Sequence, residues 1–154
     1  MTHSRLSILF ASLGSAALLA GAFLFQASGF APCHLCLLQR WPHAAAIVIG
    51  IAILALRLPR QFAWLGAVAA LATAGIGAYH SLVERHIIQG PTSCTSSGVS
   101  GSVDDLMAQI NSAPLIQCDQ ISWEMFGVTM ANLNVILSLV LCLFWIRGAL
   151  GAKR

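Results

Sequence analysis

The chain has 154 residues, of which 58% are hydrophobic and only 8% are charged. Soluble domains carry about 25% charged residues, so this chain cannot cover a surface that faces only water, and lipid must be its second solvent. The formal net charge of +3 is too small, and the basic residues are too scattered, to indicate a nucleic-acid-binding protein. The length suits one domain, with no linker rich in Pro, Gly or Ser.

The first predicted element is a membrane span over about 6–26. No charged residue occurs between Leu6 and Phe30, and a helix of about 20 apolar residues crosses the hydrocarbon core of a bilayer. A cleaved signal peptide is the alternative, but its apolar region would be about 7–15 residues long. Further spans follow, so we expect this segment to remain as a span.

Three further spans are predicted over about 35–56, 62–82 and 126–146. Pro42 lies near the start of the second span, where a proline either opens a helix or kinks it. The third span is rich in Ala and Gly, which suits close packing between helices. These elements predict an all-α integral membrane protein with a bundle of four transmembrane helices.

Charged residues are divided unevenly between the two ends of the predicted bundle. Basic residues favour the cytoplasmic side of a membrane. We therefore expect both termini in the cytoplasm, and the loops 27–34 and 83–125 on the outer, periplasmic side. All five carboxylates fall on that outer side. Six of the eight basic residues fall on the side of the termini, namely Arg5, Arg57, Arg60, Arg147, Lys153 and Arg154.

The long outer loop is predicted to carry a short amphipathic helix. Ser102 can cap its start, and Asp104 and Asp105 suit the positive end of the helix dipole. An apolar stripe follows on one side of the helix, formed by Leu106, Met107 and Ile110.

Four of the five cysteines fall at or beyond the outer end of the bundle. Cys33 and Cys36 form a C-x-x-C motif at the mouth of the second span, and Cys94 and Cys118 lie in the long loop. The C-x-x-C spacing permits a small, reducible disulfide, and the free amides of a helix start stabilise a thiolate. Cys142 lies inside the fourth span, where a small apolar filler is the simplest interpretation.

The loop cysteines Cys94 and Cys118 allow two interpretations. They could form a structural disulfide that closes a polar loop. They could also relay electrons to the first pair, because thiol–disulfide exchange needs only accessible sulfur atoms and mobile loops. The presence of two pairs on one membrane face favours the relay.

Arg40 lies four residues after Cys36, and therefore on the same helix face, one turn deeper. An arginine keeps its charge, and its burial at a membrane boundary is costly. It could reach for phosphate headgroups, or it could hold a thiolate and donate a hydrogen bond to a quinone carbonyl oxygen; the adjacent C-x-x-C motif favours the second role. His80, near the outer end of the third span, is either an interfacial polar residue or part of a quinone pocket.

A metal site is the main chemical alternative. Zinc would use two cysteines with His34, His80 or His86. However, no second C-x-x-C and no H-x₃₋₅-H motif accompanies the first pair, and an oxidising compartment favours disulfides. We therefore expect no metal.

The run from Pro32 to Pro42, PCHLCLLQRWP, resembles the first-loop signature of the bacterial DsbB disulfide-bond oxidases. Four spans, internal termini, a short first outer loop and a long second one with two more cysteines are similar to that family. The shorter loop and the sequence style look closer to divergent branches of the family, including DsbI-like paralogues. The resemblance implies that Cys33 and Cys36 are the pair next to a quinone, with Cys36 as the thiolate that engages it. It also implies that Arg40 binds the quinone.

The resemblance further implies that Cys94 and Cys118 form the loop disulfide. A periplasmic dithiol partner of the DsbA type, with a thioredoxin fold, would attack Cys94, and Cys33 and Cys118 would join transiently. His80 is the best match to the family's histidine near the outer end of the third span. Electrons would then pass to ubiquinone or menaquinone in the bacterial inner membrane, and so support disulfide bond formation.

Two other kinds of protein remain as alternatives. One is a quinone reductase of the vitamin K epoxide reductase type, in which the C-x-x-C motif lies late, in the last span; here the motif precedes the second span. The other is a membrane scaffold with two structural disulfides. An oxidase, unlike a scaffold, should be reoxidised by added quinone after reduction.

Overall fold

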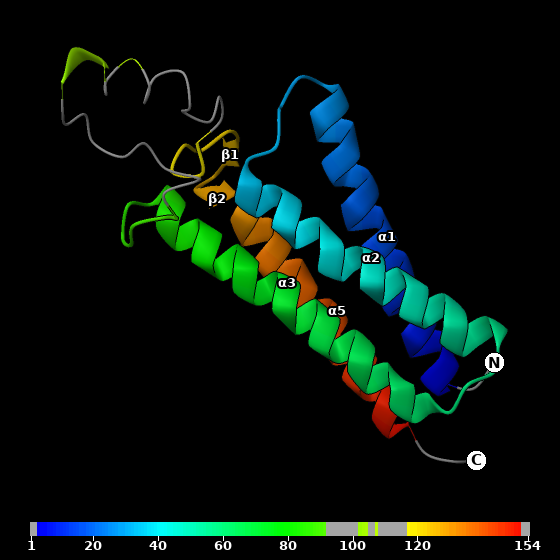
Figure 1. The fold of residues 1–154 in the computed structure, drawn as a ribbon. Helices are drawn as coiled ribbons and strands as arrows, with labels where there is room; N and C mark the ends of the chain where they lie inside the picture. Colours follow the sequence, from blue (N-terminus) through cyan, green and yellow to red (C-terminus); the bar gives the residue numbers. More distant parts are fainter. Residues whose placement is uncertain (1–2, 92–101, 105–106, 108–116, 152–154) are drawn as a thin grey trace.

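The computed structural model describes residues 3–91, 102–104, 107 and 117–151. The predicted all-α bundle of four long helices is confirmed (Figure 1). A short 3₁₀ turn, η1 (Arg60–Phe62), leads into the third helix. The four helices are α1 (His3–Ala27), α2 (His34–Ala55), α3 (Ala63–Glu84) and α5 (Met130–Leu150).

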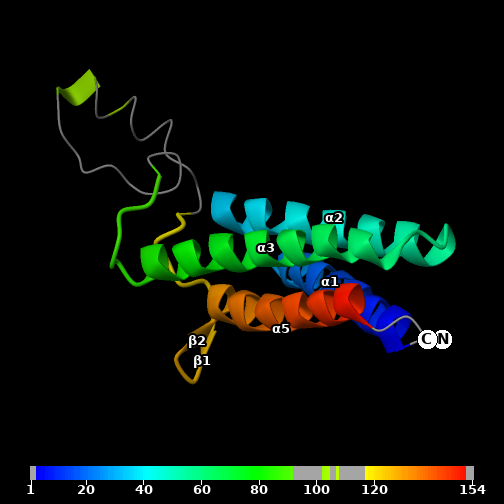
Figure 2. The same ribbon diagram turned by 90° about the horizontal axis from the view of Figure 1, so that it is seen from below.

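The helices form a closed bundle in which each one packs against two others. Helices α2 and α5 both pack against α1 and α3, so α1 and α3 face each other across a diagonal. Both termini lie at one end of the bundle, and the connections 28–33, 85–91 and 117–129 lie at the other end (Figures 1 and 2).

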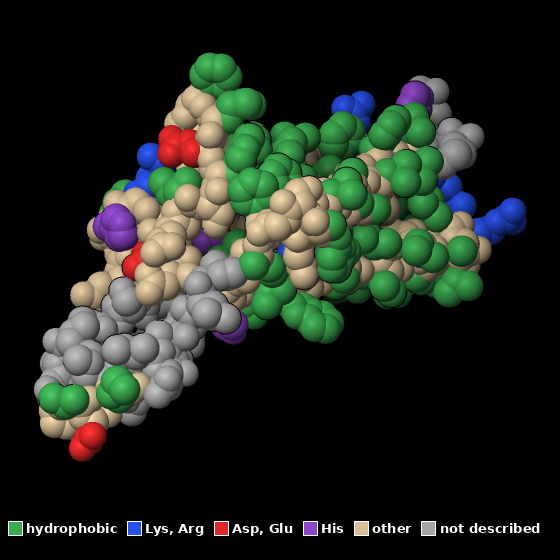
Figure 3. Space-filling view, turned by 90° about the horizontal axis from the view of Figure 1, so that it is seen from above, with side chains coloured by type: hydrophobic (Ala, Val, Ile, Leu, Met, Phe, Trp, Pro, Cys, Tyr) green, Lys and Arg blue, Asp and Glu red, His purple; other side chains and the backbone are tan. Residues whose placement is uncertain are grey.

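All four helices are long and apolar enough to cross a membrane, with the third counted from Arg60 to Glu84. Large apolar side chains cover the sides of the bundle (Figure 3). In the same view most of the basic side chains gather at the end that holds the termini, and the acidic ones in sight lie at the opposite end. The exposed apolar surface is what a lipid-facing bundle requires.

Small residues let the helices approach closely in the half of the bundle near the termini. The Trp145 side chain of α5 has no exposed surface. It lies directly against Gly66 of α3, where a Cβ atom would overlap the indole ring. Gly50 of α2 similarly makes room for the Ser12 hydroxyl of α1. Glycine and alanine thus replace the shape complementarity that larger side chains provide in soluble cores.

Pro42 lies inside α2, and the helix continues through it to Ala55. The N-cap of α2 is Cys33, whose backbone is extended. The expected amphipathic helix between Ser102 and Ile110 falls mostly outside the described residues.

The start of the fourth span was predicted wrongly. The helix begins at Met130 instead of near Phe126, because residues 124–129 form an antiparallel hairpin of β1 (Glu124–Met125) and β2 (Val128–Thr129). Phe126 and Gly127 at its tip have φ angles of 53° and 78°, as a two-residue hairpin turn requires. Thr129 then caps α5, since its hydroxyl accepts a hydrogen bond from the Asn132 amide at 3.3 Å.

Candidate functional site

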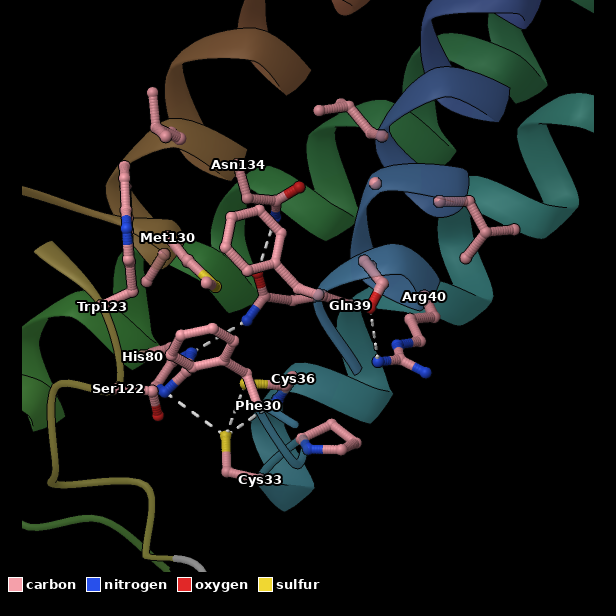
Figure 4. A pocket seen from close by; sticks show the side chains of 18 of the residues that line it. Phe30, Cys33, Cys36, Gln39, Arg40, His80, Ser122, Trp123, Met130 and Asn134 are labelled. Atoms are coloured by element: carbon pink, nitrogen blue, oxygen red, sulfur yellow. Dashed lines mark hydrogen bonds between the residues drawn. The ribbon is translucent and has the colours of Figure 1, made fainter. Parts of the chain in front are cut away.

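A cavity of about 250 Å³ lies at the end of the bundle opposite the termini (Figure 4). Its wall is mostly apolar and includes three aromatic rings, one of which contacts the other two. The Phe25 ring lies 5.7 Å from the Phe30 ring and 6.0 Å from the Trp123 ring, measured between centroids. The polar side chains that line it come from three helices and their connections; they include Cys33, Cys36, Gln39, Arg40, His43, His80, Glu84 and Asn134.

The C-x-x-C motif is held by the first turn of α2. The Cys33 sulfur accepts a hydrogen bond from the Cys36 amide at 3.2 Å, in the manner of an N-cap side chain. The two sulfur atoms are 2.8 Å apart. Cys33 is 5% exposed, whereas Cys36 is half-buried. This arrangement suits a bond that forms and breaks without movement of the helix.

The two sulfur atoms differ in their hold on a proton. The hydrogen bond with the Cys36 sulfur, followed by burial, raises the pKa of the Cys33 thiol above its ordinary value. This raised pKa favours a proton on Cys33 in the reduced pair. Thiolates, rather than thiols, act as nucleophiles and electron donors.

His80 of α3 contacts the cysteine pair directly. Its Nε2 atom lies 3.5 Å from the Cys33 sulfur and 3.5 Å from Glu84 Oε1, and the imidazole is 3% exposed. Glu84 is itself buried, at 6% exposed. The sequence alone placed Glu84 only on the outer side; the structure adds it to the cavity wall. Its i, i+4 spacing from His80 was the available signal.

Behind His80, a group of polar side chains crosses the bundle. Gln39 of α2 contacts His80 Nδ1 at 3.0 Å and Asn134 of α5 at 2.6 Å. Asn134 also contacts His43 of α2 at 2.9 Å and the Thr73 hydroxyl of α3 at 3.1 Å. Sequence analysis missed this group, although single polar residues within membrane spans are expected to be functional.

Arg40 lies at the cavity wall with its guanidinium turned to α1. Its Nη1 donates to Gln26 Oε1 at 2.7 Å and its Nη2 to the Ala22 carbonyl oxygen at 3.3 Å. The group also lies over the Phe23 ring, 4.7 Å from the centroid. Its Nε is buried without a hydrogen-bond partner among the described residues. The arginine is therefore oriented by α1, and its Nε is one of the N–H donors that remain without a partner in the described part of the chain.

Cys118 reaches the first cysteine pair from the long loop. It is fully buried and packs in one cluster with Cys33, Leu35 and Val83, against which Cys36 also packs. Cys118 is disulfide-bonded. Cys94 lies outside the described residues, so the pairing of Cys94 with Cys118 stays a prediction.

Two further observations concern the other cysteine and histidine candidates. Cys142 is a free, buried thiol in α5, and its sulfur contacts the Ala67 carbonyl oxygen at 3.6 Å. His34 and His86 are exposed. His80, by contrast, brings its ring nitrogen and the sulfurs of Cys33 and Cys36 within 4.8 Å of one another, a set that could hold a metal ion.

Four apolar helices around a cavity that ends in a cysteine pair define a multi-pass membrane thiol oxidoreductase. The comparisons identify its family. The model described as Disulfide bond formation protein DsbB matches residues 4–147, and the chain belongs to the DsbB family. The resemblance of the C-x-x-C region is thereby confirmed.

Two curated relatives illustrate the range of similarity. Disulfide bond formation protein B of Herminiimonas arsenicoxydans is 29% identical over 168 residues, covering 99% of both chains. Uncharacterized protein RP370 of Rickettsia prowazekii (strain Madrid E) is 27% identical over 121 residues, covering 75% of this chain and 69% of the relative. No solved structure matches the chain significantly.

Proposed function

We propose that this protein is a membrane thiol oxidase that reoxidises a periplasmic DsbA-like dithiol protein and passes the electrons to a membrane quinone. The observation that carries the proposal is the placement of Cys36, Arg40 and His80 around one aromatic-walled cavity in an apolar bundle. The cytoplasmic location of both termini is part of the same proposal. It is supported by the basic end of the bundle.

The relay begins at the loop pair. A thiolate of the reduced partner attacks Cys94, which releases the Cys118 thiolate, and the partner's second thiol displaces Cys94 and leaves the partner oxidised. The Cys118 thiolate then attacks Cys33 of an oxidised Cys33–Cys36 pair and releases the Cys36 thiolate. Attack of Cys94 on Cys118 restores the loop disulfide and leaves Cys33 and Cys36 reduced. The contact of buried Cys118 with Cys33 supports the exchange between pairs.

The cavity fits a quinone headgroup in its chemistry. The rings of Phe25, Phe30 and Trp123 offer flat apolar surfaces, and Arg40 retains a donor suited to a carbonyl oxygen. A bound quinone would accept two electrons and two protons and so reoxidise the Cys33–Cys36 dithiol. The role of the chain is to orient the headgroup, hold Cys36 as a thiolate and supply protons from its own side chains.

Anaerobic stopped-flow mixing tests this function. The purified protein is mixed with a reduced DsbA-like partner and a soluble ubiquinone or menaquinone analogue, and quinone absorbance is followed. The natural chain should turn over, and Cys36→Ser should not. Cys94→Ser should lose turnover with the partner, yet reduce one equivalent of quinone after chemical reduction of its first pair.

Cys142→Ser is the matched control, because this cysteine lies in α5 among the residues packed around Trp145. It should turn over like the natural chain. Undiminished turnover of Cys94→Ser with the partner would contradict the relay. A natural chain that quinone cannot reoxidise would instead support a structural role for both disulfides.

A further inference from the structure

A continuous series of buried and partly buried hydrogen bonds runs from the middle of the bundle to the cysteine pair (Figure 4). Asn134 Nδ2 lies 2.6 Å from Gln39 Oε1, and Gln39 Nε2 lies 3.0 Å from His80 Nδ1. On the other side of the ring, His80 Nε2 lies 3.5 Å from the Cys33 sulfur. Cys33 and Cys36 are the last pair, with sulfur atoms 2.8 Å apart. The direction of donation along this series decides what His80 can do.

At the inner end of the series, a backbone carbonyl determines which way the Asn134 side-chain amide is oriented. Asn134 Nδ2 lies 3.3 Å from the carbonyl oxygen of Thr73, and a carbonyl oxygen can only accept hydrogen bonds. The Asn134 amide must therefore present its NH₂ group on this side. The same NH₂ group faces Gln39, so Gln39 must present its oxygen to Asn134.

A second backbone carbonyl independently determines the orientation of the Gln39 side-chain amide. Gln39 Nε2 lies 3.3 Å from the carbonyl oxygen of Leu35, which again requires a donor. The other hydrogen of that NH₂ group points to His80 Nδ1, which must accept it. A reversed Gln39 amide would place two acceptors together at Leu35 and two donors together at Asn134.

A neutral imidazole carries its proton on one nitrogen only, so acceptance at Nδ1 leaves the proton of His80 on Nε2. The Cys33 sulfur and Glu84 Oε1 each lie 3.5 Å from Nε2, and both can accept a hydrogen bond from it. Cys33 can then give its own S–H to Cys36.

We propose that Gln39 and Asn134 are positioning residues that hold His80 as the Nε2–H tautomer, so that successive hydrogen bonds donate in one direction and end at the Cys36 sulfur. Hydrogen bonds in such a series strengthen one another. The tautomer follows from the geometry alone, whereas its use to stabilise Cys36 as electron donor rests on the proposed function.

The same tautomer disfavours the binding of a metal ion by His80 and the cysteine pair. The ring nitrogen and the two sulfur atoms lie close enough to share one ion. A ligating imidazole nitrogen must be free of its proton, and its other nitrogen must then donate a hydrogen bond. The Gln39 NH₂ group offers His80 Nδ1 a donor where metal binding would need an acceptor. Glutamine at position 39 thus disfavours zinc binding by His80, Cys33 and Cys36.

Nuclear magnetic resonance of ¹⁵N-histidine tests the tautomer in the reduced full-length chain in lipid nanodiscs. His80→Gln identifies the His80 signals by their loss. In the natural chain Nδ1 should be unprotonated and Nε2 protonated. In Gln39→Glu, the carboxylate accepts instead of donating, so Nδ1 should become protonated. Asn134→Leu removes one of the two contacts that orient the Gln39 amide, so the His80 Nδ1 signal should shift part of the way toward the protonated position.

Gln89→Glu is the matched control, because Gln89 is exposed near the same end of the bundle. It adds the same charge and should leave the His80 signals unchanged. A protonated Nδ1 in the natural chain would overturn the inference, whether or not any variant folds. Equal His80 signals in Gln39→Glu and the natural chain would also overturn it.

Cadmium binding provides a second readout that needs neither quinone nor partner. Cd²⁺ is titrated into the reduced proteins, and the sulfur-to-cadmium charge-transfer absorbance is followed. Groups that orient metal-ligating histidines change metal affinity about 10–100-fold, so Gln39→Glu should bind Cd²⁺ at least tenfold more tightly than the natural chain. Equal Cd²⁺ affinities of Gln39→Glu and the natural chain would contradict the inference that Gln39 disfavours metal binding. If the natural chain does not turn over quinone, the proposed function is refuted. The results of the nuclear magnetic resonance and cadmium experiments would still stand, because neither uses quinone.

Discussion

At the residue scale, the two sulfur atoms of the C-x-x-C motif are chemically unequal. Cys33 is buried beside Cys118, and its thiol pKa is raised by the hydrogen bond with the Cys36 sulfur and by burial. A thiol with a raised pKa stays protonated until the pH exceeds its ordinary titration range. Cys36 is half-buried and faces the cavity.

This inequality predicts the order of alkylation. In the reduced protein near pH 7, iodoacetamide should modify Cys36 at least tenfold faster than Cys33, because only the thiolate reacts. Reaction at Cys33 should rise only as the pH is raised well above 9. Fragment mass spectrometry of the peptide that contains both cysteines measures the two rates. Faster modification of Cys33 at pH 7 would contradict the assignment of the thiolate to Cys36.

Arg40 is predicted to act through the shape of its guanidinium as well as its charge. It contacts Gln26 Oε1, the Ala22 carbonyl oxygen and the Phe23 ring at once. A lysine keeps the charge but cannot reproduce this fork. Arg40→Lys should raise the KM for quinone about 10–100-fold, equivalent to one or two charged hydrogen bonds, and change kcat less.

Arg85→Lys is the control for that measurement, because Arg85 is exposed at the same end of the bundle and donates a hydrogen bond to the Gly127 carbonyl oxygen. Its KM for quinone should match that of the natural chain. Equal KM values for the Arg40 and Arg85 variants would assign Arg40 the role of a membrane anchor.

At the scale of the helices, the packing predicts which glycines are essential. A Cβ atom at Gly66 would overlap the Trp145 indole, whereas one at Gly75 of the same helix meets nothing within 4 Å. Gly66→Ala should destabilise the protein by about 1–3 kcal/mol, as overpacking does. Gly75→Ala should be neutral or stabilising by up to about 1 kcal/mol, because it removes a helical glycine.

Thermal denaturation in detergent, followed by circular dichroism, compares the two variants. Similar midpoints for Gly66→Ala and Gly75→Ala would mean that α3 does not press against Trp145 as described. The contrast isolates packing from helix propensity, since both substitutions are Gly→Ala within α3.

The helices could be predicted from the sequence because their length and apolar content are set by the thickness of a bilayer. The rotation of each helix about its axis could not be predicted, because a helix that is apolar on every side does not show in its sequence which face turns inward. The meeting of Gln39, His80 and Asn134 therefore required the structure. The start of α5 was missed for a local reason: Thr129 caps the helix, and apolar Met125, Phe126 and Val128 in the hairpin extended the hydrophobic run.

The C-x-x-C pair and Arg40 were accessible to sequence analysis because they lie within eight residues on one helix start, so helix geometry alone brings them together. His80 could be proposed only through family resemblance, since its contact with Cys33 joins α3 to α2. Glu84 and Asn134 depend in the same way on how separate helices pack.

At the scale of the whole molecule, the proposed electron transfer between the two cysteine pairs requires the loop to bring Cys118 to Cys33. The two lie in one buried cluster. The double variant Cys36→Ser/Cys94→Ser removes the predicted partners of Cys33 and Cys118, and we expect these two cysteines to form an internal disulfide. A faster-migrating monomer in non-reducing electrophoresis, with the cross-linked peptide identified by mass spectrometry, would record it.

The control for this disulfide test adds Cys118→Ser to the double variant, so that Cys33 and Cys142 are the remaining cysteines. The sulfur of Cys142 lies against Ala67, among the residues packed around Trp145, so no internal cross-link should form. Failure of the Cys33–Cys118 bond in the double variant would argue that the loop pair cannot reach the first pair, and the relay would lose its central step.

Membrane orientation governs every step, because the loop cysteines must face the compartment of their partner. The basic residues near the termini favour a cytoplasmic location for that end. In a variant whose five cysteines are replaced by serine, Ile87→Cys should react with a membrane-impermeant maleimide in intact spheroplasts, since Ile87 is 65% exposed at the cavity end. Gln61→Cys, exposed at the end of the termini, should react only after the membrane is permeabilised. The reverse pattern would place the cysteine pairs in the cytoplasm, where a periplasmic dithiol could not reach them.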